Sequence, residues 1–377
     1  MKPLSVFLLN CDWKDMFRDS FIVLKDKLYR DRLGGDINSF YIFSWARTSY
    51  FQKKDSRFSS IHRKTKLDYF RPLLDVWTFP VVIYHVWKNK IKNDVWTCYD
   101  FGFAPTLWVL KKLFGGKFIM CLNNQPRMYS KTRRFGSIKS IYSWIIEKLF
   151  YRLPDHFFTI NETMRSYLMT LGVDKSKITV FSMNTIDRDK DFIAQAQKGI
   201  IRKKYSIPEN NKILLTVARL EAEKNYHRLL ELFSGLGDGY TLIALGSGSL
   251  FEELKAKCRD LGIEKRVIFA GFVHRDEIWN FYADADVFVL LSKVEALGVV
   301  FWEAMYAQVP IVGSIADGIV ETIGKDGDRG RIWEEAKDQE GFNEIIKNAR
   351  LDPAMLVRAK AYVEEKISNH VTINNIV

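Results

Sequence analysis

Two glutamates eight positions apart mark the stretch SKVEALGVVFWEAMYAQVPIVGS, residues 292–314. Glu295 lies in a short loop after an apolar, strand-like run, and Glu303 lies in a helix expected to begin near Gly298. A glycine there lets the backbone approach a ligand, and a helix N-terminus suits phosphate. A loop charge and a solvated helix residue would also explain the glutamates. However, the neighbours of Glu303 are nearly all apolar, so an ionised carboxylate there needs a ligand or a partner.

Two cations follow an earlier strand-like run, in TVARLEAEKN, residues 216–225. Arg219 and Lys224 suit a diphosphate, because a guanidinium binds phosphate oxygens in a forked manner. A pair of surface charges is the simpler alternative. In ALGSGSLFEEL, Gly246 and Gly248 allow close backbone approach, although a turn that needs positive φ explains them equally well.

A further strand-like run ends at Gly271, and the backbone of Phe272 and Val273 after it could bind the edge of a base. A helix-cap region is an equally good interpretation of this segment.

Strand-like and helix-like segments alternate along the 377 residues, which predicts parallel sheets covered on both faces. The pattern stops in the polar stretch 184–212, interpreted as a crossing between domains, and then restarts. The expected strands are 4–10, 40–45, 94–99, 117–122, 156–161 and 178–183, then 212–218, 240–246, 266–272, 286–292 and 310–314.

The fold prediction is therefore α/β, with two doubly wound, Rossmann-like domains facing a cleft. The expected domains are 1–190 and 205–350, followed by a helix within 351–377 that could pack back on the N-terminal domain.

Charge is distributed unevenly. Residues 1–200 contain 34 Lys and Arg against 18 Asp and Glu, whereas the rest of the chain is slightly acidic. This basic half predicts an acidic partner, such as an anionic lipid surface, a nucleic acid or a phosphate-bearing acceptor. The four cysteines have no zinc-site spacing and are expected to be buried free thiols in a reducing cytosol. No apolar run is long enough to span a membrane.

Residues 212–323 resemble the donor-binding half of the GT4-type family of retaining glycosyltransferases, whose architecture is called GT-B. The order and spacing of the family's motifs agree over about a hundred residues. The matching positions are Arg219 and Lys224, Gly246 and Gly248, Glu295 and Glu303, Pro310 to Val312, and Gly318 with Glu321.

The resemblance implies a retaining, metal-independent hexosyltransferase that needs no cofactor besides its nucleotide diphosphate sugar. Arg219 and Lys224 would bind the diphosphate and stabilise the leaving group, while Glu295 would face the transferred sugar. Glu303 would hold the ribose. The remaining contacts with the nucleotide sugar would come from Leu297, Gly298, Val299, Gly246, Gly248, Phe272 and Val273. Asp284 and Asp286 have the spacing of a metal-binding pair, but they lead directly into a buried strand.

The first half departs from the family's pattern. The junction MNTID, 183–187, has Thr185 where glycine is usual, and the loop NCDWKD after the first strand has no glycine. On the acceptor side, Asn123 or Asn124 stands where the family often has histidine.

We therefore expect sugar transfer to a lipid-linked or surface-glycan acceptor, in polysaccharide, lipopolysaccharide or glycolipid biosynthesis. The basic N-terminal half, with an amphipathic pattern in 127–152 and further cations in 53–71, predicts a cytoplasmic protein peripheral on the membrane. The alternative for the helix in 127–152 is that its apolar face packs on the sheet. A nucleotide-sugar epimerase or phosphorylase of the same fold remains an alternative. A nucleic-acid-binding protein is another, although no nucleic-acid motif supports it and nucleic acid is not expected as a partner.

Overall fold

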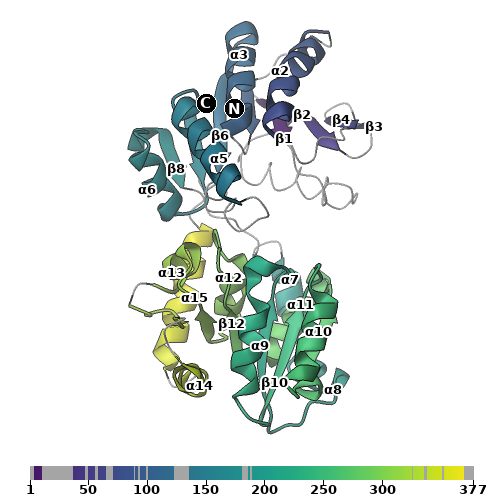
Figure 1. The fold of residues 1–377 in the computed structure, drawn as a ribbon, viewed down its shortest axis with the longest axis vertical. Coiled ribbons are helices and arrows are strands. Elements are labelled where there is room, and N and C mark those ends of the chain that lie inside the picture. The colour runs from purple at the N-terminus through teal and green to yellow at the C-terminus, as the bar shows by residue number, and fades with distance from the viewer. Residues whose placement is uncertain are drawn as a thin grey trace. The chain divides into compact units, whose positions relative to one another are not determined.

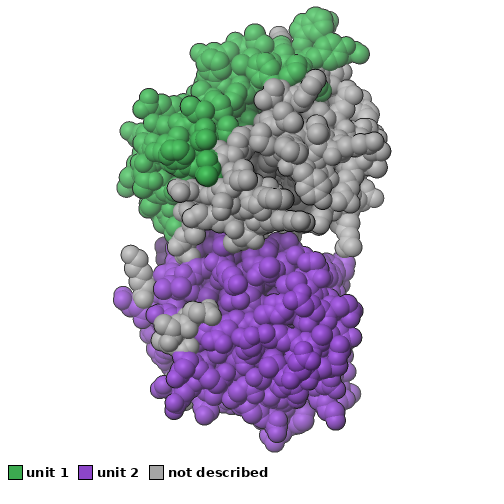
Figure 2. Space-filling view, in the orientation of Figure 1, with its two compact units in different colours: residues 1–182, 370–377 green, residues 183–369 purple. Residues whose placement is uncertain are grey.

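The chain forms two compact units in a computed structural model: residues 1–182 with 370–377, and residues 183–369 (Figure 2). The boundary falls near residue 182 rather than at the predicted 190. The structure describes residues 4–10, 37–46, 50–55, 58–64, 71–88, 90–91, 94–98, 101–122, 136–180, 186, 189–324, 326–334, 338–349 and 352–368.

In the first unit, the described strands form a sheet in the order β3-β4-β2-β1-β5-β6-β7-β8 (Figure 1). Neighbouring strands are parallel except for β3 and β4, which pair antiparallel and which the sequence analysis did not predict. The bounds are Leu4–Asn10, Ile37–Ala46, Tyr50–Asp55, Phe58–Lys64, Val95–Cys98, Lys117–Leu122, His156–Thr159 and Ile178–Val180 for β1 to β8.

The helices of this unit pack on its sheet through one apolar cluster. Alternate strand residues Trp96, Phe118 and Phe157 share this cluster with Leu107 of α3 and Leu168 of α6. Because side chains alternate across a strand, these residues lie on one face of the sheet. The helices and the 3-10 helix η1 have the bounds Arg71–Lys88 (α2), Phe101–Phe103 (η1), Ala104–Phe114 (α3), Gly136–Phe150 (α5) and Glu162–Thr170 (α6).

The second unit contains a fully parallel sheet with the strand order β11-β10-β9-β12-β13-β14. Its first strand, β9, pairs with β10 on one side and β12 on the other, so the strand order reverses there. In open α/β sheets this switch point is where ligands bind, outside the carboxyl ends of the strands. The strands are Lys212–Val217 (β9), Tyr240–Leu245 (β10), Val267–Gly271 (β11), Val287–Leu290 (β12), Ile311–Gly313 (β13) and Arg331–Ile332 (β14).

The helices of the second unit alternate with its strands, as predicted. Their bounds are Tyr226–Ser234 (α9), Phe251–Asp260 (α10), Arg275–Asp284 (α11), Val299–Tyr306 (α12), Asp317–Ile323 (α13), Gln339–Asn348 (α14) and Pro353–Ser368 (α15). The predicted α/β fold class with doubly wound, Rossmann-like sheets is therefore confirmed.

The polar stretch 184–212 is more than a crossing, which corrects the prediction. It contains α7, Lys190–Gln195, and α8, Ile200–Lys204. The buried carboxylate of Asp284, at the end of α11, accepts hydrogen bonds from the backbone N–H groups of Ile201 and Arg202 at 2.7 and 3.1 Å. Such bonds satisfy the unpaired amides of a helix start, so α8 is fastened to α11.

Helix α15 belongs to the second unit. It lies against α12, where the rings of Trp302 and Tyr362 meet edge to face with their centroids 6.2 Å apart. None of the described helices combines the length and the apolar character that crossing a membrane would need.

Candidate functional site

Loops at the carboxyl ends of five strands of the second sheet are bonded to one another through their backbones. Leu220, after β9, donates to the Ser247 carbonyl after β10 at 3.1 Å, and Gly246 donates to the Gly271 carbonyl of β11 at 2.7 Å. Gly318, after β13, donates to Glu295, after β12, at 3.1 Å. Segments that are far apart in sequence therefore form one continuous edge at the switch point.

The glycines of this edge are where neighbouring loops approach most closely. A Cβ on Gly246 or Gly248 would lie 2.0 or 2.2 Å from a carbonyl oxygen of the β9 loop. Gly246 also has φ of +129°, a backbone conformation that favours glycine. At Gly248 the close approach of the neighbouring loop is what excludes a larger residue. Both glycines thus set the position of the loop that carries Arg219.

Lys224 and Glu295, which the sequence placed after different strands, form an ion pair. The Lys224 ammonium lies 2.6 Å from a carboxylate oxygen of Glu295, and each side chain is only 15% exposed. The Ser292 hydroxyl donates to the same oxygen at 3.5 Å. The cation after β9 and the carboxylate after β12 therefore share one location beside the switch point.

Arg219 lies on the same loop as Lys224 and is the more accessible cation, with 55% of its side chain exposed. Its guanidinium donates to Glu223 at 2.7 Å, at an exposed position where such a pair is easily exchanged for a ligand. Arg219 can therefore turn towards an anion while Lys224 stays partly buried.

Helix α12 begins at Val299 with Gly298 at its N-cap, in the left-handed conformation at φ 65°. No side-chain hydrogen bond caps this end, so the first amides of the helix lack the usual side-chain acceptor. Leu297 is buried beneath the turn. The geometry has the features that the sequence analysis associated with phosphate binding.

Glu303 is buried in the second turn of α12, and both of its carboxylate oxygens accept hydrogen bonds. The Arg275 guanidinium donates to one oxygen at 2.8 Å, and the Tyr282 hydroxyl donates to the other at 2.8 Å. Burial and then the negative charge of Glu303 raise the pKa of Tyr282 well above its ordinary value. Tyr282 therefore remains a hydrogen-bond donor at neutral pH.

Arg275 also binds Asp189, a buried carboxylate just before α7, through two of its N–H groups. Burial acts to lower the pKa of Arg275, but the carboxylates of Glu303 and Asp189 outweigh it and raise that pKa. Neither Arg275 nor Asp189 was predicted from the sequence as a site residue. The apolar surroundings of Glu303 were the signal that some partner was required.

The loop after β11 is open at its tip. Gly271 ends the strand with φ of +70°, and Phe272 is exposed, with its ring edge against His274 at a centroid distance of 5.8 Å. Val273 is half-buried between them. Backbone groups of this loop lie on the same edge as Gly246, which bonds to Gly271.

Asp284 and Asp286 have structural partners. Asp284 caps α8, and Asp286 accepts from Arg202 at 3.2 Å and from the Ile213 amide at 2.8 Å. These contacts agree with the expectation that the pair leads into buried structure. Asn123, Asn124 and most of the 183–187 junction lie outside the described residues.

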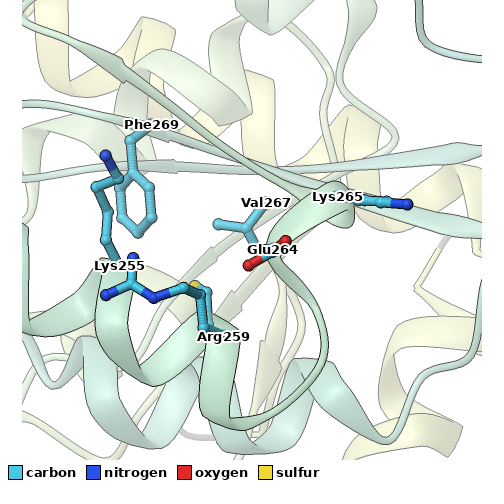
Figure 3. A pocket seen from close by; sticks show the side chains of 7 residues that line it. Lys255, Arg259, Glu264, Lys265, Val267 and Phe269 are labelled. Atoms are coloured by element: carbon cyan, nitrogen blue, oxygen red, sulfur yellow. The ribbon is translucent and has the colours of Figure 1, made fainter.

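A shallow pocket of about 320 Å³ lies elsewhere on the second unit, between α10 and β11 (Figure 3). Its charged lining residues are Lys255, Arg259, Glu264 and Lys265, and buried Cys258 also lines it. No candidate site residue lines this pocket, so it is separate from the ion pair at the switch point.

Two parallel-sheet α/β units of this topology define the GT-B architecture, and solved structures agree. Sucrose-phosphate synthase from Thermosynechococcus elongatus matches with a TM-score of 0.73 at 15% identity, covering 99% of this chain and 96% of that one. The Anabaena protein HepE, solved in complex with UDP, matches with a TM-score of 0.67 at 16% identity, covering 99% and 97%. At these identities the likeness establishes the fold.

Residues 197–366 match the family "Glycosyl transferases group 1", and this segment belongs to it. The resemblance to GT4-type glycosyltransferases is thereby confirmed. An uncharacterized glycosyltransferase of Methanocaldococcus jannaschii is 28% identical over 201 residues, 52% of this chain and 51% of that protein. The lipopolysaccharide core biosynthesis glycosyltransferase LpsE of Rhizobium meliloti is 31% identical over 160 residues, 42% and 46%. The chain thus spans about half the length of the curated relatives it matches.

Proposed function

We propose that this protein is a retaining glycosyltransferase that takes a sugar from a nucleotide diphosphate donor. The observation that carries the proposal is the ion pair of Lys224 and Glu295 at the switch point, with the accessible Arg219 on the same loop. The family match over residues 197–366 and the UDP complex of HepE support a nucleotide-sugar donor.

In this proposal the diphosphate binds between the cations and the start of α12. Arg219 separates from Glu223 and Lys224 separates from Glu295, so that both cations face phosphate oxygens. The amides of Leu297, Gly298 and Val299 contact the donor, and Glu303 accepts hydrogen bonds from the ribose. Gly246, Gly248, Phe272 and Val273 complete the contacts around the nucleotide, and no metal ion is needed because the two cations balance the diphosphate charge.

The reaction then exchanges one bond at the anomeric carbon of the sugar. The carbon–oxygen bond to the diphosphate breaks as the acceptor hydroxyl forms a new bond on the same face, and the hydroxyl proton passes to the departing phosphate oxygen. Arg219 and Lys224 stabilise the negative charge that develops on that oxygen, which is the largest contribution a preorganised site can make. Glu295, released from Lys224, holds hydroxyls of the transferred sugar.

For the acceptor we propose a lipid-linked or surface glycan, with the protein peripheral on the cytoplasmic face of the membrane. The printed role of LpsE in lipopolysaccharide core biosynthesis supports this acceptor class. Asn123 or Asn124 would act on the acceptor side. Nucleic acid is not part of the proposal.

An apolar stripe on α5 supports membrane binding by the basic half. Ile141, Trp144, Ile145 and Leu149 are 42–63% exposed, whereas Ile146 and Phe150, on another face of the helix, pack on the core. The exposure of Ile141, Ile145 and Leu149 contradicts the alternative, in which the apolar face of this helix packs on the sheet. Exposed aliphatic and aromatic groups within a strongly cationic half fit an anionic lipid surface, where each well-placed cation contributes about 1 kcal/mol.

Thermal shifts with UDP, GDP and ADP test sugar-donor binding. A nucleotide that occupies the site stabilises the fold by about 2.7 kcal/mol at a hundredfold excess over its Kd. Glu303→Ala should remove that shift. If none of the three nucleotides stabilises the wild-type protein, sugar-donor binding at this site is refuted.

Vesicle co-sedimentation tests the membrane surface. Ile145→Glu with Leu149→Glu should abolish binding to vesicles rich in phosphatidylglycerol, whereas Val357→Glu, at an equally exposed aliphatic position on α15, should not. Equal binding of both variants would contradict docking through α5.

A further inference from the structure

The four side chains around Glu303 differ sharply in their access to solvent. Asp189 and Glu303 are almost completely buried, at 1% and 2% exposure of their side chains, whereas the Arg275 side chain is 35% exposed. Tyr282 and Trp279, which complete the hydrogen bonding, are also buried. A ligand approaching Glu303 from solvent therefore meets the Arg275 guanidinium first.

Asp189 is a fixed anchor for that guanidinium. One of its oxygens accepts from Arg275 Nε at 2.7 Å, from Nη2, and from the Trp279 indole N–H at 3.1 Å. The remaining arm of the fork, Nη1, reaches Glu303. Since an arginine fork is planar and its side chain cannot lose its charge in a protein, this arrangement fixes both the position and the charge beside Glu303.

The charge matters because a buried carboxylate without a cation favours its protonated form. An ionised carboxylate accepts stronger hydrogen bonds than a neutral one, and each of its oxygens has two acceptor sites. An oxygen of Glu303 that already accepts from Arg275 can thus accept from a ribose hydroxyl as well.

We propose that Arg275 is a positioning residue for sugar-donor binding: anchored on Asp189, it holds the Glu303 carboxylate in the orientation that accepts the ribose of the nucleotide. The inference rests on the proposed function, because it takes Glu303 as the ribose acceptor. It adds a link between the segment that begins the second unit, where Asp189 lies, and the nucleotide site.

The groups that act on this cluster are Arg275 and Tyr282 from α11 and Asp189 before α7. Arg202 of α8 binds Asp286, and near α15 the charges of Arg329 and Lys360 lie over the rings of Tyr362 and Tyr306. Arg275 and Tyr282 are therefore the side chains that hold the Glu303 carboxylate in place.

Calorimetric titration with the tightest binder among UDP, GDP and ADP, at about pH 6 and about pH 8, tests the proposal. Arg275→Gln should weaken binding roughly tenfold or more at both pH values, because the Glu303 carboxylate loses the guanidinium that holds it. Arg275→Lys keeps the charge but loses the fork, and should bind with intermediate affinity. Arg202→Gln removes an arginine from the half-buried carboxylate of Asp286, just after α11, and should bind like the wild type at both pH values.

If Arg275→Gln binds the nucleotide as tightly as the wild type, or more tightly, at both pH values, the inference is overturned. Tighter binding would mean that Arg275 obstructs access to Glu303. Should Arg275→Gln fail to fold, Arg275→Lys and Asp189→Asn decide, because unaltered affinity and pH profile in both would also overturn it. A wild-type chain that binds none of the three nucleotides refutes the proposed function as well, so the two failures are distinguishable.

Discussion

Replacing Lys224 by methionine tests both the stability of the ion pair and its role in sugar transfer. The ammonium and the Glu295 carboxylate are 2.6 Å apart and 15% exposed, so the lysine's removal leaves a largely buried carboxylate without its cation. At an effective dielectric of about 20, the Coulomb energy at this distance is roughly 6 kcal/mol before desolvation. Hydrogen bonds to charged groups retain a net contribution of about 1.5–3 kcal/mol.

Lys224→Met should therefore lower the free energy of unfolding by about 2 kcal/mol. For a unit the size of residues 183–369 this corresponds to a fall in Tm of roughly 4–8 °C, measurable by calorimetry. The same variant should reduce kcat/KM about 100-fold or more, because the leaving diphosphate loses one of its cations.

A double-mutant cycle with Glu295→Gln separates the two effects. The neutral partner should restore most of the stability lost in Lys224→Met, since no buried charge remains, but should not restore activity. If Lys224→Met is as stable as the wild type and shows no coupling to Glu295→Gln, the ion pair is absent from the free protein and the reasoning fails.

Three further outcomes follow from single contacts. Gly248→Ala places a Cβ 2.2 Å from the Leu220 carbonyl oxygen. It should lower the free energy of unfolding in urea by about 1–3 kcal/mol and weaken nucleotide binding. The control Gly239→Ala, with open space around its Cβ, should change neither quantity. Asp284→Ala removes the acceptor for the first amides of α8 and should lower Tm by roughly 4–8 °C, as followed by circular dichroism. Burial raises the pKa of Cys258 to about 11, so its thiol should react with dithionitrobenzoate at about pH 8 only after the protein unfolds. The contribution of this thiol to the free energy of unfolding is complete below the ordinary thiol pKa and is lost as the pH rises towards 11. Fast reaction of native Cys258 would contradict its burial.

The sequence predicted the parallel strands and most helices because buried parallel strands are short apolar runs that need no tertiary information to be recognised. The expected strands 4–10 and 117–122 coincide with the observed bounds of β1 and β6. The antiparallel pair β3 and β4 and the short helices α7 and α8 were missed. Their segments are polar and charged, so periodicity gave no signal, and α8 depends on Asp284, more than eighty residues away.

For the candidate site, the sequence determined which residue types follow each strand. Parallel strands bring their carboxyl ends to one edge, so Lys224 and Glu295 could be expected to meet, and they do. The tertiary structure alone decided what surrounds Glu303. The contacts of Arg275 with Asp189 and Glu303 join side chains 86 and 28 positions apart on elements that meet only through packing, and no local pattern encodes such a meeting.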